Sequence, residues 1–380
     1  MKFFHISDLH IGKKIREMDI SKDQEFILNE IIKMVDKEKP DGIFIAGDIY
    51  DRSVPPADAI NLLDDFITQL EDRNLQVFVI SGNHDSPDRL QFGKDILEKN
   101  QVYITGVFNG SLEKVVLSDQ YGPVNIFMLP FIKPSLVGNY YKDQVIDSYE
   151  KAVALVLESE KIDTNQRNVL IAHQFITNQG QEPEQSESEA IRVGGLDNID
   201  VSLFDSFDYV ALGHIHRPQK VGRDTVRYCG TPLKYSFSES NHKKSVTMIE
   251  FKEKGKIDIT LLPLTPMKDM KIIKDTLKNL LSLEQYINHS EDYIYAIVTD
   301  EEDLFDPIGQ LRSVYKNILF LEIEKEKTQL SKDDFFLLEE VKEKKPLDMF
   351  REFYINQNNS EMTENQEKIF MEILDKIGGE

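Results

Sequence analysis

Cysteine is almost absent from this chain of 380 residues, and positive charge is in short supply. The single cysteine, Cys229, cannot form an internal disulfide bond, which favours a reducing cytoplasm. The 45 basic residues are outnumbered by 67 acidic ones, so the formal net charge is -22. Such a charge excludes a protein that grips nucleic acid over its whole surface, because the phosphate backbone would be repelled. A polyanionic substrate must instead be held by metal ions, a local basic patch or a partner.

Long hydrophobic runs are missing as well. No signal-peptide core precedes the first apolar run, and no later stretch has membrane-spanning length. Internal repeats and low-complexity tracts are also absent from the sequence. We therefore expect a soluble cytoplasmic protein without a membrane partner, large enough for one main domain and one or two smaller ones.

The chain does contain a series of short apolar runs, several of them rich in β-branched residues. Such runs are typical of strands buried on both faces of a sheet. They cover residues 3–7, 43–46, 77–81, 126–129, 169–172 and 209–212. Amphipathic helical patterns at residues 21–39 and 57–71 separate the first three, and Ser21 and Gln24 match a capping box. The alternation predicts a layered α/β fold in which two mixed β-sheets pack together and are flanked by helices.

The second half of the chain predicts two further parts. A β-hairpin pattern at residues 245–264 is followed by Pro266, a plausible boundary. Residues 266–324 carry enough helix and strand pattern for a small α/β domain, whereas residues 325–380 are charged and helical. A second capping box opens an amphipathic helix at residues 363–377, which packs either on a partner or back on its own domain. The expected parts are residues 1–265, 266–324 and 325–380.

Five polar clusters follow in chain order, most of them at the end of an apolar run. They are Asp8-Leu9-His10, Gly47-Asp48, Gly82-Asn83-His84-Asp85, His173 and Gly213-His214-Ile215-His216. Parallel strands deliver the residues at their carboxyl ends to one edge of a sheet, so distant clusters can share one pocket. Carboxylate, imidazole and amide donors without thiolate suit two divalent ions, Mn²⁺ best, with Mg²⁺, Fe or Zn compatible. One cluster alone is ordinary turn chemistry, but the whole set predicts a two-metal phosphoesterase.

Spacing within the clusters predicts individual roles. Asp48 is placed to bridge both ions, Asp8 and His10 stand two apart so as to reach one of them, and Asn83 adds a neutral oxygen. His214 and His216 would point the same way on an extended segment, each towards one of two neighbouring ions.

His84 and Asp85 are predicted to act beside the ligands. Because His84 directly follows Asn83, it should face the substrate and donate a proton to the leaving oxygen or stabilise the phosphorane. Asp85 is expected to orient His84 or a ligating histidine through a hydrogen bond. The remaining histidines are expected to be structural or solvated: His5, His242 and His289.

These clusters resemble the calcineurin-like metallophosphoesterase superfamily over about residues 1–251. Residues 82–90, 213–219 and 230–239 are more specifically similar to its branch of Mre-type DNA nucleases. The resemblance implies that one ion is bound by Asp8, His10, Asp48 and His216. It implies that the other is bound by Asp48, Asn83, His173 and His214, and that His84 acts on the phosphate. Archaeal and eukaryotic members carry a histidine three positions after the bridging aspartate, where this chain has Asp51.

The resemblance further implies a metal-dependent DNA exonuclease and endonuclease of repair, recombination and replication, associated with the nucleoid. Double-stranded and hairpin DNA would be its substrates, and residues 266–324 would form a DNA-binding cap. Residues 325–380 would dock on the coiled coil of an ABC-type ATPase, and helices near residues 55–70 and 88–98 would form a homodimer. Two alternatives stay open: a metallophosphatase or phosphodiesterase of small substrates, and a dimeric scaffold with a vestigial site.

Overall fold

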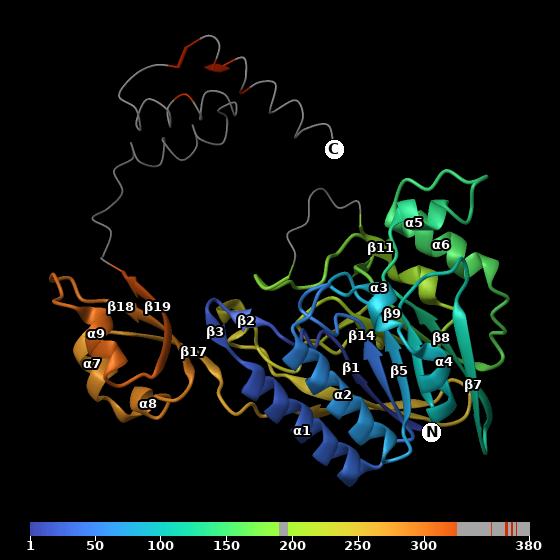
Figure 1. Cartoon of the computed structure of the whole chain (residues 1–380), viewed down its shortest axis with the longest axis horizontal. Helices are drawn as coiled ribbons and strands as arrows, with labels where there is room; N and C mark the ends of the chain where they lie inside the picture. The colour runs from blue at the N-terminus through green and yellow to red at the C-terminus, as the bar shows by residue number, and fades with distance from the viewer. Residues whose placement is uncertain (190–196, 325–350, 352–361, 364–365, 368–369, 371–380) are drawn as a thin grey trace. The chain divides into compact units, whose positions relative to one another are not determined.

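The computed structural model describes residues 1–189, 197–324, 351, 362–363, 366–367 and 370 (Figure 1). It forms two units, Met1–Val298 with Leu304–Glu322, and Thr299–Asp303 with Ile323–Glu380. In the second unit the backbone N–H of Thr363 donates to Gln366 Oε1 at 2.9 Å, and the N–H of Gln366 donates to Thr363 Oγ1 at 3.4 Å, as the capping box predicts. Most of the predicted tail lies outside the described residues. None of the helices that the structure describes is long and apolar enough to cross a membrane.

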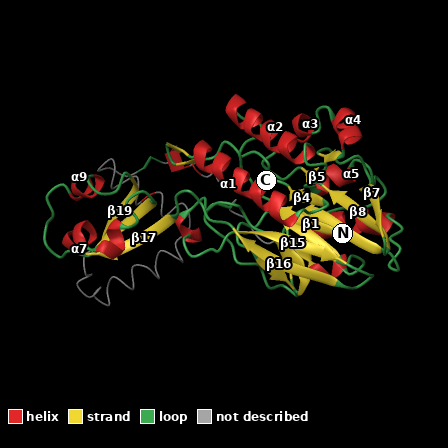
Figure 2. Cartoon of the chain, turned by 90° about the horizontal axis from the view of Figure 1, so that it is seen from below, coloured by secondary structure: helices red, strands yellow, loops and turns green. Residues whose placement is uncertain are grey.

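The first sheet of the larger unit has six strands in the order β16-β15-β1-β4-β5-β6 (Figure 2). Their bounds are β1 (Lys2–Ile6), β4 (Gly42–Ala46), β5 (Gln76–Ile80), β6 (Val102–Thr105), β15 (Ser245–Phe251) and β16 (Ile257–Pro263). Strands β1, β4, β5 and β6 are parallel, and the hairpin β15–β16 adds antiparallel strands beside β1. Helices α1 (Ser21–Glu38) and α2 (Ala57–Glu71) pack on one face of this sheet through an apolar core.

The second sheet also has six strands, in the order β13-β14-β12-β9-β8-β7. Their bounds are β7 (Glu113–Asp119), β8 (Gly122–Leu129), β9 (Arg167–His173), β12 (Tyr209–Gly213), β13 (Gln219–Val221) and β14 (Arg223–Tyr228). Helices α5 (Pro134–Gly138) and α6 (Tyr149–Ser159) contribute to the core on its outer face. Short elements complete this part: β2 (Lys14–Ile15), β3 (Met18–Asp19), α3 (Pro87–Leu90), α4 (Lys94–Leu97), β10 (Ile176–Thr177) and β11 (Ile199–Asp200).

A third core lies between the two sheets. Phe3 and Phe44 of the first sheet stack with ring centroids 4.7 Å apart, and Phe44 and Phe78 pack at 5.7 Å. These rings share one buried cluster with Val169 and Tyr209 of the second sheet. The order of layers is therefore helix, sheet, sheet, helix, and the predicted fold class of two mixed sheets flanked by helices is confirmed.

Residues after the hairpin form a three-stranded sheet with helices. Its elements are β17 (Met270–Asp275), α7 (Leu277–Ser282), α8 (Glu284–Ile287), β18 (Tyr293–Val298), α9 (Pro307–Arg312) and β19 (Asn317–Ile323). Strand β17 was not predicted, because three of its six residues are charged and hide the alternation that marks a strand. The boundary at residue 266 stays a prediction.

The capping box predicted at the start of α1 is wrong. The residue that precedes the helix is Ile20, which has no side-chain acceptor, and the N–H of Ser21 donates instead to Asp19 Oδ1 at 2.8 Å. The side chain of Gln24 leaves the helix end altogether. It accepts a hydrogen bond from the N–H of Gly12 at 3.0 Å and donates one to the carbonyl of His10 at 2.8 Å. Gln24 thus supports the loop after β1 rather than the helix.

Candidate metal centre

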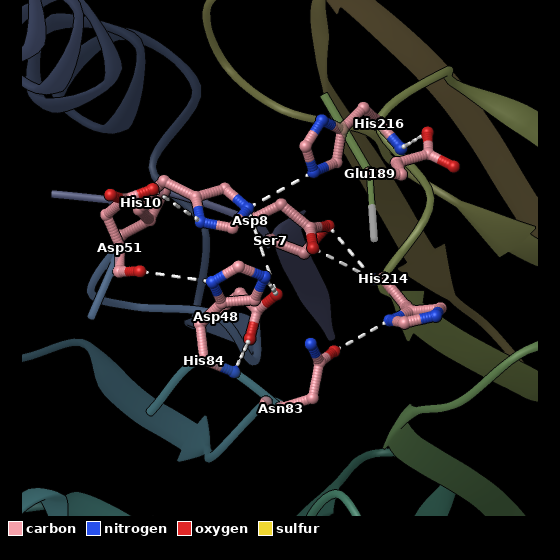
Figure 3. A network of polar contacts seen from close by, with 12 residues as sticks. Ser7, Asp8, His10, Asp48, Asp51, Asn83, His84, Glu189, His214 and His216 are labelled. Atoms are coloured by element: carbon pink, nitrogen blue, oxygen red, sulfur yellow. Dashed lines mark hydrogen bonds and ion pairs between the residues drawn. The ribbon is translucent and has the colours of Figure 1, made fainter. Parts of the chain in front are cut away.

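The ends of β1, β4, β5, β9 and β12, together with the loops that follow them, bring the polar clusters to one place (Figure 3). The loops after β1 and β4 run side by side, because the N–H of Asp8 donates to the carbonyl of Gly47 and that of His10 to the carbonyl of Asp48, both at 3.0 Å. The second sheet contributes its histidines from the facing layer. All seven predicted ligand residues meet here: Asp8, His10, Asp48, Asn83, His173, His214 and His216.

Several of these residues have a left-handed backbone. The φ angles are 52° at Asp8, 43° at His10, 48° at Asp48 and 106° at His214. Such conformations cost about 1–3 kcal/mol each in non-glycine residues and persist only where the surroundings impose them. Gly213 permits the close approach expected of it, since a Cβ there would collide with the carbonyl oxygen of Ala46. The strained backbone therefore places these side chains in the site and lowers the stability of the fold.

Asp48 is central among the potential ligand atoms. Its Oδ2 lies 3.3 Å from His173 Nε2 and 3.8 Å from His10 Nε2. Its Oδ1 accepts a hydrogen bond from the backbone N–H of His84 at 2.9 Å. One carboxylate oxygen therefore lies between imidazoles from two sheets, which suits a ligand shared by two ions.

The other donors fall on either side of Asp48. Asn83 Oδ1 lies 2.8 Å from His214 Nδ1 and 3.1 Å from His173 Nε2. On the other side, His10 Nε2 and His216 Nε2 are 3.1 Å apart. Asp8, His10 and His216 form one group able to hold a cation, and Asp8, Asp48 and His173 form another.

His214 and His216 do not share one extended segment, so that prediction is wrong. Strand β12 ends at Gly213, and the positive φ of His214 turns the chain immediately afterwards. The N–H of His214 donates to Asp8 Oδ1 at 2.9 Å, while its ring faces Asn83. The ring of His216 faces His10 instead. The two imidazoles therefore serve opposite sides of the site because of the turn, not because of strand alternation.

The electrostatics of the site fit divalent cations. Burial raises the pKa of Asp8 to about 8, and the nearby carboxylate of Asp48 adds to the shift. Burial lowers the pKa of His10 well below its usual value. Burial lowers the pKa of His216 as well. The facing Nε2 atoms of His10 and His216 can bind a cation or share a proton. A fold of this class with these donors therefore binds divalent metal ions.

His173 is held in the tautomer that a metal ligand needs. It is fully buried, and its Nδ1 donates to the carbonyl of Ala46 at 2.8 Å. Nε2 is thereby left facing Asp48 and Asn83. Burial acts to lower the pKa of His173, but the carboxylates of Asp48 and Asp8 outweigh it and raise this pKa to about 9.

His84 lies at the rim, where the side chain is 30% exposed. Its Nδ1 donates to the carbonyl of Asp51 at 3.0 Å, and its ring lies edge-on to that of His10 with centroids 4.9 Å apart. Nε2 is 4.0 Å from Asp48 Oδ2. The imidazole is thus fixed beside the bridging carboxylate, in a position from which it can reach a phosphate.

Asp85 has a different role from the one predicted. Its carboxylate accepts hydrogen bonds from the N–H groups of Ile49, Tyr50 and Gly82 at 3.1, 2.9 and 2.8 Å. No histidine is among the described partners of this carboxylate. Burial, together with the charge of Asp48, raises the pKa of Asp85 to about 6. Because its oxygens accept hydrogen bonds from N–H groups of both segments, Asp85 ties the loop after β4 to the loop after β5.

A buried network behind His216 was missed from the sequence. His216 Nδ1 lies 2.7 Å from Ser188 Oγ, which in turn donates to Glu239 Oε1 at 2.5 Å. The Nζ of Lys244, which is buried, donates to Glu239 Oε2 at 2.6 Å, to Thr231 Oγ1 at 2.6 Å and to the carbonyl of His216 at 2.8 Å. Burial acts to raise the pKa of Glu239, but Lys244 and His216 hold it well below its usual range.

The sequence did contain one signal for this network. Glu239 ends the segment 230–239 whose similarity to Mre-type nucleases was noted, although nothing in that segment resembles a ligand pattern. The network fixes the ring of His216 through Ser188 and its backbone carbonyl through Lys244.

Asp51, where distant relatives carry histidine, forms an ion pair with Lys13 at 2.7 Å. Its Oδ1 is also 3.8 Å from Nδ1 of His10. The carboxylate of Asp51 therefore lies near Nδ1 of His10, a candidate ligand, and its backbone carbonyl accepts a hydrogen bond from His84.

The three histidines expected to lie outside the centre do so. His5 is buried and bonded to Tyr209 Oη at 3.0 Å, and His289 pairs with Asp292 at 2.8 Å. His242 lies 4.0 Å from Glu239.

The layered fold and the clustered donors define a metal-dependent phosphoesterase. Residues 1–218 match the family model of the calcineurin-like phosphoesterases, and the chain belongs to that family, as its resemblance predicted. The chain is also similar to SbcD, the D component of the nuclease SbcCD, of Staphylococcus epidermidis, with 32% identity over 380 residues that make up 99% of each chain. Residues 266–358 match a model described as the type 5 capsule protein repressor C-terminal domain (SbcD_C).

Two solved structures are similar at a much lower level. A dimetal phosphatase from Danio rerio has 11% identity and a TM-score of 0.40, covering 70% of this chain and 99% of its own. The protein TT1561 of Thermus thermophilus has 12% identity and a TM-score of 0.40, covering 68% of this chain and 98% of its own. Likeness at this level says nothing about the substrate.

Metal binding should be measurable as a gain in stability. Mn²⁺ at about 1,000 times its Kd would stabilise the native state by about 4 kcal/mol, a rise in Tm of roughly 5–10 °C. We expect Asp48→Asn to abolish most of this rise in a thermal melt, because the central carboxylate is lost. Asp36→Asn, which removes an exposed partner of Arg73, is the matched control and should keep it. An equal rise in both variants would contradict the role of Asp48.

Proposed function

We propose that this chain is a metal-dependent DNA exonuclease and endonuclease subunit that hydrolyses phosphodiester bonds at DNA ends and hairpins together with an SbcC ATPase. The observation that carries the proposal is the convergence of six further oxygen and nitrogen donor residues around Asp48. The similarity to SbcD of the nuclease SbcCD along almost the whole chain supports DNA as the substrate and SbcC as the partner. The enzyme would act in repair and recombination on DNA of the nucleoid.

The proposed ligand sets follow the two sides of the site. Asp8, His10, Asp48 and His216 would hold one ion, supported by the 3.1 Å approach of the two Nε2 atoms. The second set would be Asp48, Asn83, His173 and His214, supported by the contacts of Asn83 with both imidazoles. The mixed oxygen and nitrogen donors favour Mn²⁺, with Mg²⁺ as the alternative.

Bound divalent ions would neutralise the phosphate oxygens and activate the attacking water. His84 would donate a proton to the leaving oxygen or a hydrogen bond to the phosphorane. Its anchor on the carbonyl of Asp51 leaves Nε2 as the atom that faces the reacting group. Asp85 would act indirectly, as a positioning residue that keeps the loops of Asp48 and His84 together.

Cleavage assays test this proposal. The purified chain is incubated with labelled duplex and hairpin DNA and Mn²⁺, with and without SbcC and ATP. Cleavage is expected, and its absence under every combination would refute the nuclease function. Hydrolysis of small phosphoesters without DNA cleavage would support a phosphatase or small-substrate phosphodiesterase instead. Metal binding without any hydrolysis would support a scaffold.

Residues 266–324 would form the DNA-binding cap, and residues 325–380 would dock on the coiled coil of SbcC. The match of residues 266–358 to the SbcD_C model supports an assignment of this region to the same kind of subunit. Truncation after Glu324 is expected to abolish co-purification with SbcC, while the Mn²⁺-dependent rise in Tm persists. An unchanged complex would overturn the assignment of the tail.

A homodimer would form through α2 and the segment of α3 and α4. Apolar side chains are exposed there: Phe92 is 87% exposed, Ile96 69% and Ile60 47%. Exposed apolar side chains of this size are typical of a surface that is covered by a partner. We expect Phe92→Asp to convert the dimer into a monomer in light scattering, with Phe305→Asp, which is also exposed, as the control. A wild-type monomer at all concentrations would contradict the dimer.

A further inference from the structure

A pocket of about 490 Å³ opens beside the metal centre and has no role in the chemistry described so far. The segment after β5 lines it with Asn83, Asp85 and Pro87, and the segment after β8 lines it with Phe131, Lys133, Leu136 and Asn139. The volume lies within the range of small-ligand sites, roughly 300–1,000 Å³. Because Asn83 is shared with the candidate ligands, whatever fills this pocket lies directly beside the reacting phosphate.

Phe131 is the aromatic wall of the pocket and is fixed in place. Its N–H donates to the carbonyl of Ser81 at 2.9 Å, which ties it to the end of β5. Its ring is nearly parallel to that of His214, with an interplanar angle of 19° and centroids 6.4 Å apart. His173 meets the same ring edge-on at 6.3 Å. The Phe131 ring is therefore packed against the rings of two candidate metal ligands, His214 and His173.

Lys133 supplies a cation at the same opening. Its side chain is exposed, and among the described residues its ammonium has no ion-pair partner. An unpaired lysine beside a phosphoesterase site is notable in a chain of net charge -22. Leu136 and Pro87 add apolar surface, and Asn139 offers hydrogen bonds at the edge. An apolar slot with an aromatic wall, polar edges and a cation matches a nucleotide more closely than it matches a simple phosphate.

We propose that this pocket binds the nucleobase of the nucleotide whose 5′-phosphate is being cleaved, with Phe131 as the stacking surface and Lys133 contacting a neighbouring phosphate. The inference rests on the proposed nuclease function and adds a specificity site to it. A base inside a duplex cannot enter, because it is stacked and paired, so the terminal nucleotide must first be separated. The pocket therefore favours frayed or single-stranded ends over fully paired ones.

Two small diesters with the same leaving group test the site. Thymidine 5′-(p-nitrophenyl phosphate) carries a base, whereas methyl p-nitrophenyl phosphate does not. With Mn²⁺, Phe131→Leu should lower kcat/KM for the thymidine ester roughly tenfold, because aromatic stacking is lost, with little change for the methyl ester. Phe131→Tyr, which keeps the aromatic face, should behave as wild type. An equal loss on both esters, or no loss on either, would overturn the proposal.

A binding measurement gives an independent readout. Single-stranded oligonucleotides with 2-aminopurine at the 5′ or the 3′ terminal position are bound to a His84→Ser chain, in which cleavage is slowed. Fluorescence quenching by stacking is expected for one of the two, and it should disappear with Phe131→Leu. Lys133→Met should reduce the slope of log affinity against log salt by about 1, whereas exposed Lys161→Met should not. An unchanged slope in the Lys133 variant would remove that residue from the site.

Failure of the pocket and failure of the proposed function can be told apart. If the wild-type chain hydrolyses neither ester and no DNA, the nuclease function itself is refuted. If it hydrolyses both esters while the Phe131 variants change nothing, only the nucleobase site is wrong.

Discussion

His84→Ser is expected to lower kcat for phosphodiester hydrolysis by roughly 10²- to 10⁴-fold, the usual contribution of a positioned general acid or base. The imidazole lies beside Asp48, but its Nδ1 is occupied by the carbonyl of Asp51 and it is not among the proposed ligands. The Mn²⁺-dependent rise in Tm should therefore be nearly unchanged. Steady-state kinetics on a chromogenic diester and a thermal melt with Mn²⁺ measure the two effects on one sample.

His289→Ser makes the same chemical change away from the metal centre, where the ring pairs with Asp292. It should retain wild-type kcat. Loss of Mn²⁺ binding in the His84 variant would show that His84 is a ligand and that its assigned role is wrong. Full activity in that variant would show that the leaving oxygen is protonated by another group.

Lys244→Met is expected to destabilise the fold by about 3–5 kcal/mol, because it leaves the buried carboxylate of Glu239 without its cation. Removal of this ammonium also frees the carbonyl of His216 and the hydroxyl of Thr231. The Tm should fall by roughly 5–15 °C. Isothermal titration should also show weaker Mn²⁺ binding, since the anchor of His216 is loosened.

The double variant Glu239→Gln with Lys244→Met removes both charges and should recover a large part of the lost stability. Lys256→Met is the surface control, because its pair with Glu253 is exposed, and its Tm should match the wild type. A double variant as unstable as the single one would mean that packing of the lysine stem, not charge pairing, sets the cost.

The strands at the core of the fold could be predicted because they are buried on both faces. Residues 43–46 and 209–212 are continuous apolar runs, and the structure extends each by only one residue. Strand β17 was missed since its lysines and aspartate lie on a small, half-exposed sheet. The capping box at Ser21 failed for a different reason: Gln24 finds better partners in the loop after β1 than at the helix end. Local propensity was overridden by a tertiary contact.

The candidate site was predictable in its members but not in its arrangement. Ligand residue types in strand-end positions indicated which side chains would meet, and all seven do meet. The turn at His214 could not be predicted from the sequence, because a positive φ in a non-glycine residue is imposed by its surroundings. The network of Ser188, Glu239 and Lys244 could not be predicted either. These residues come from separate segments, and their spacing in the sequence matches no known pattern.

The origin of the donors in two separate sheets has a consequence for assembly. Asp8, His10, Asp48 and Asn83 come from the first sheet, whereas His173, His214 and His216 come from the second. A fragment that ends after β6 (Val102–Thr105) would hold four of the donors and would lack the imidazoles that oppose them. Metal ions bound by donors of both sheets would link the two layers, so metal occupancy would report that the layers have docked.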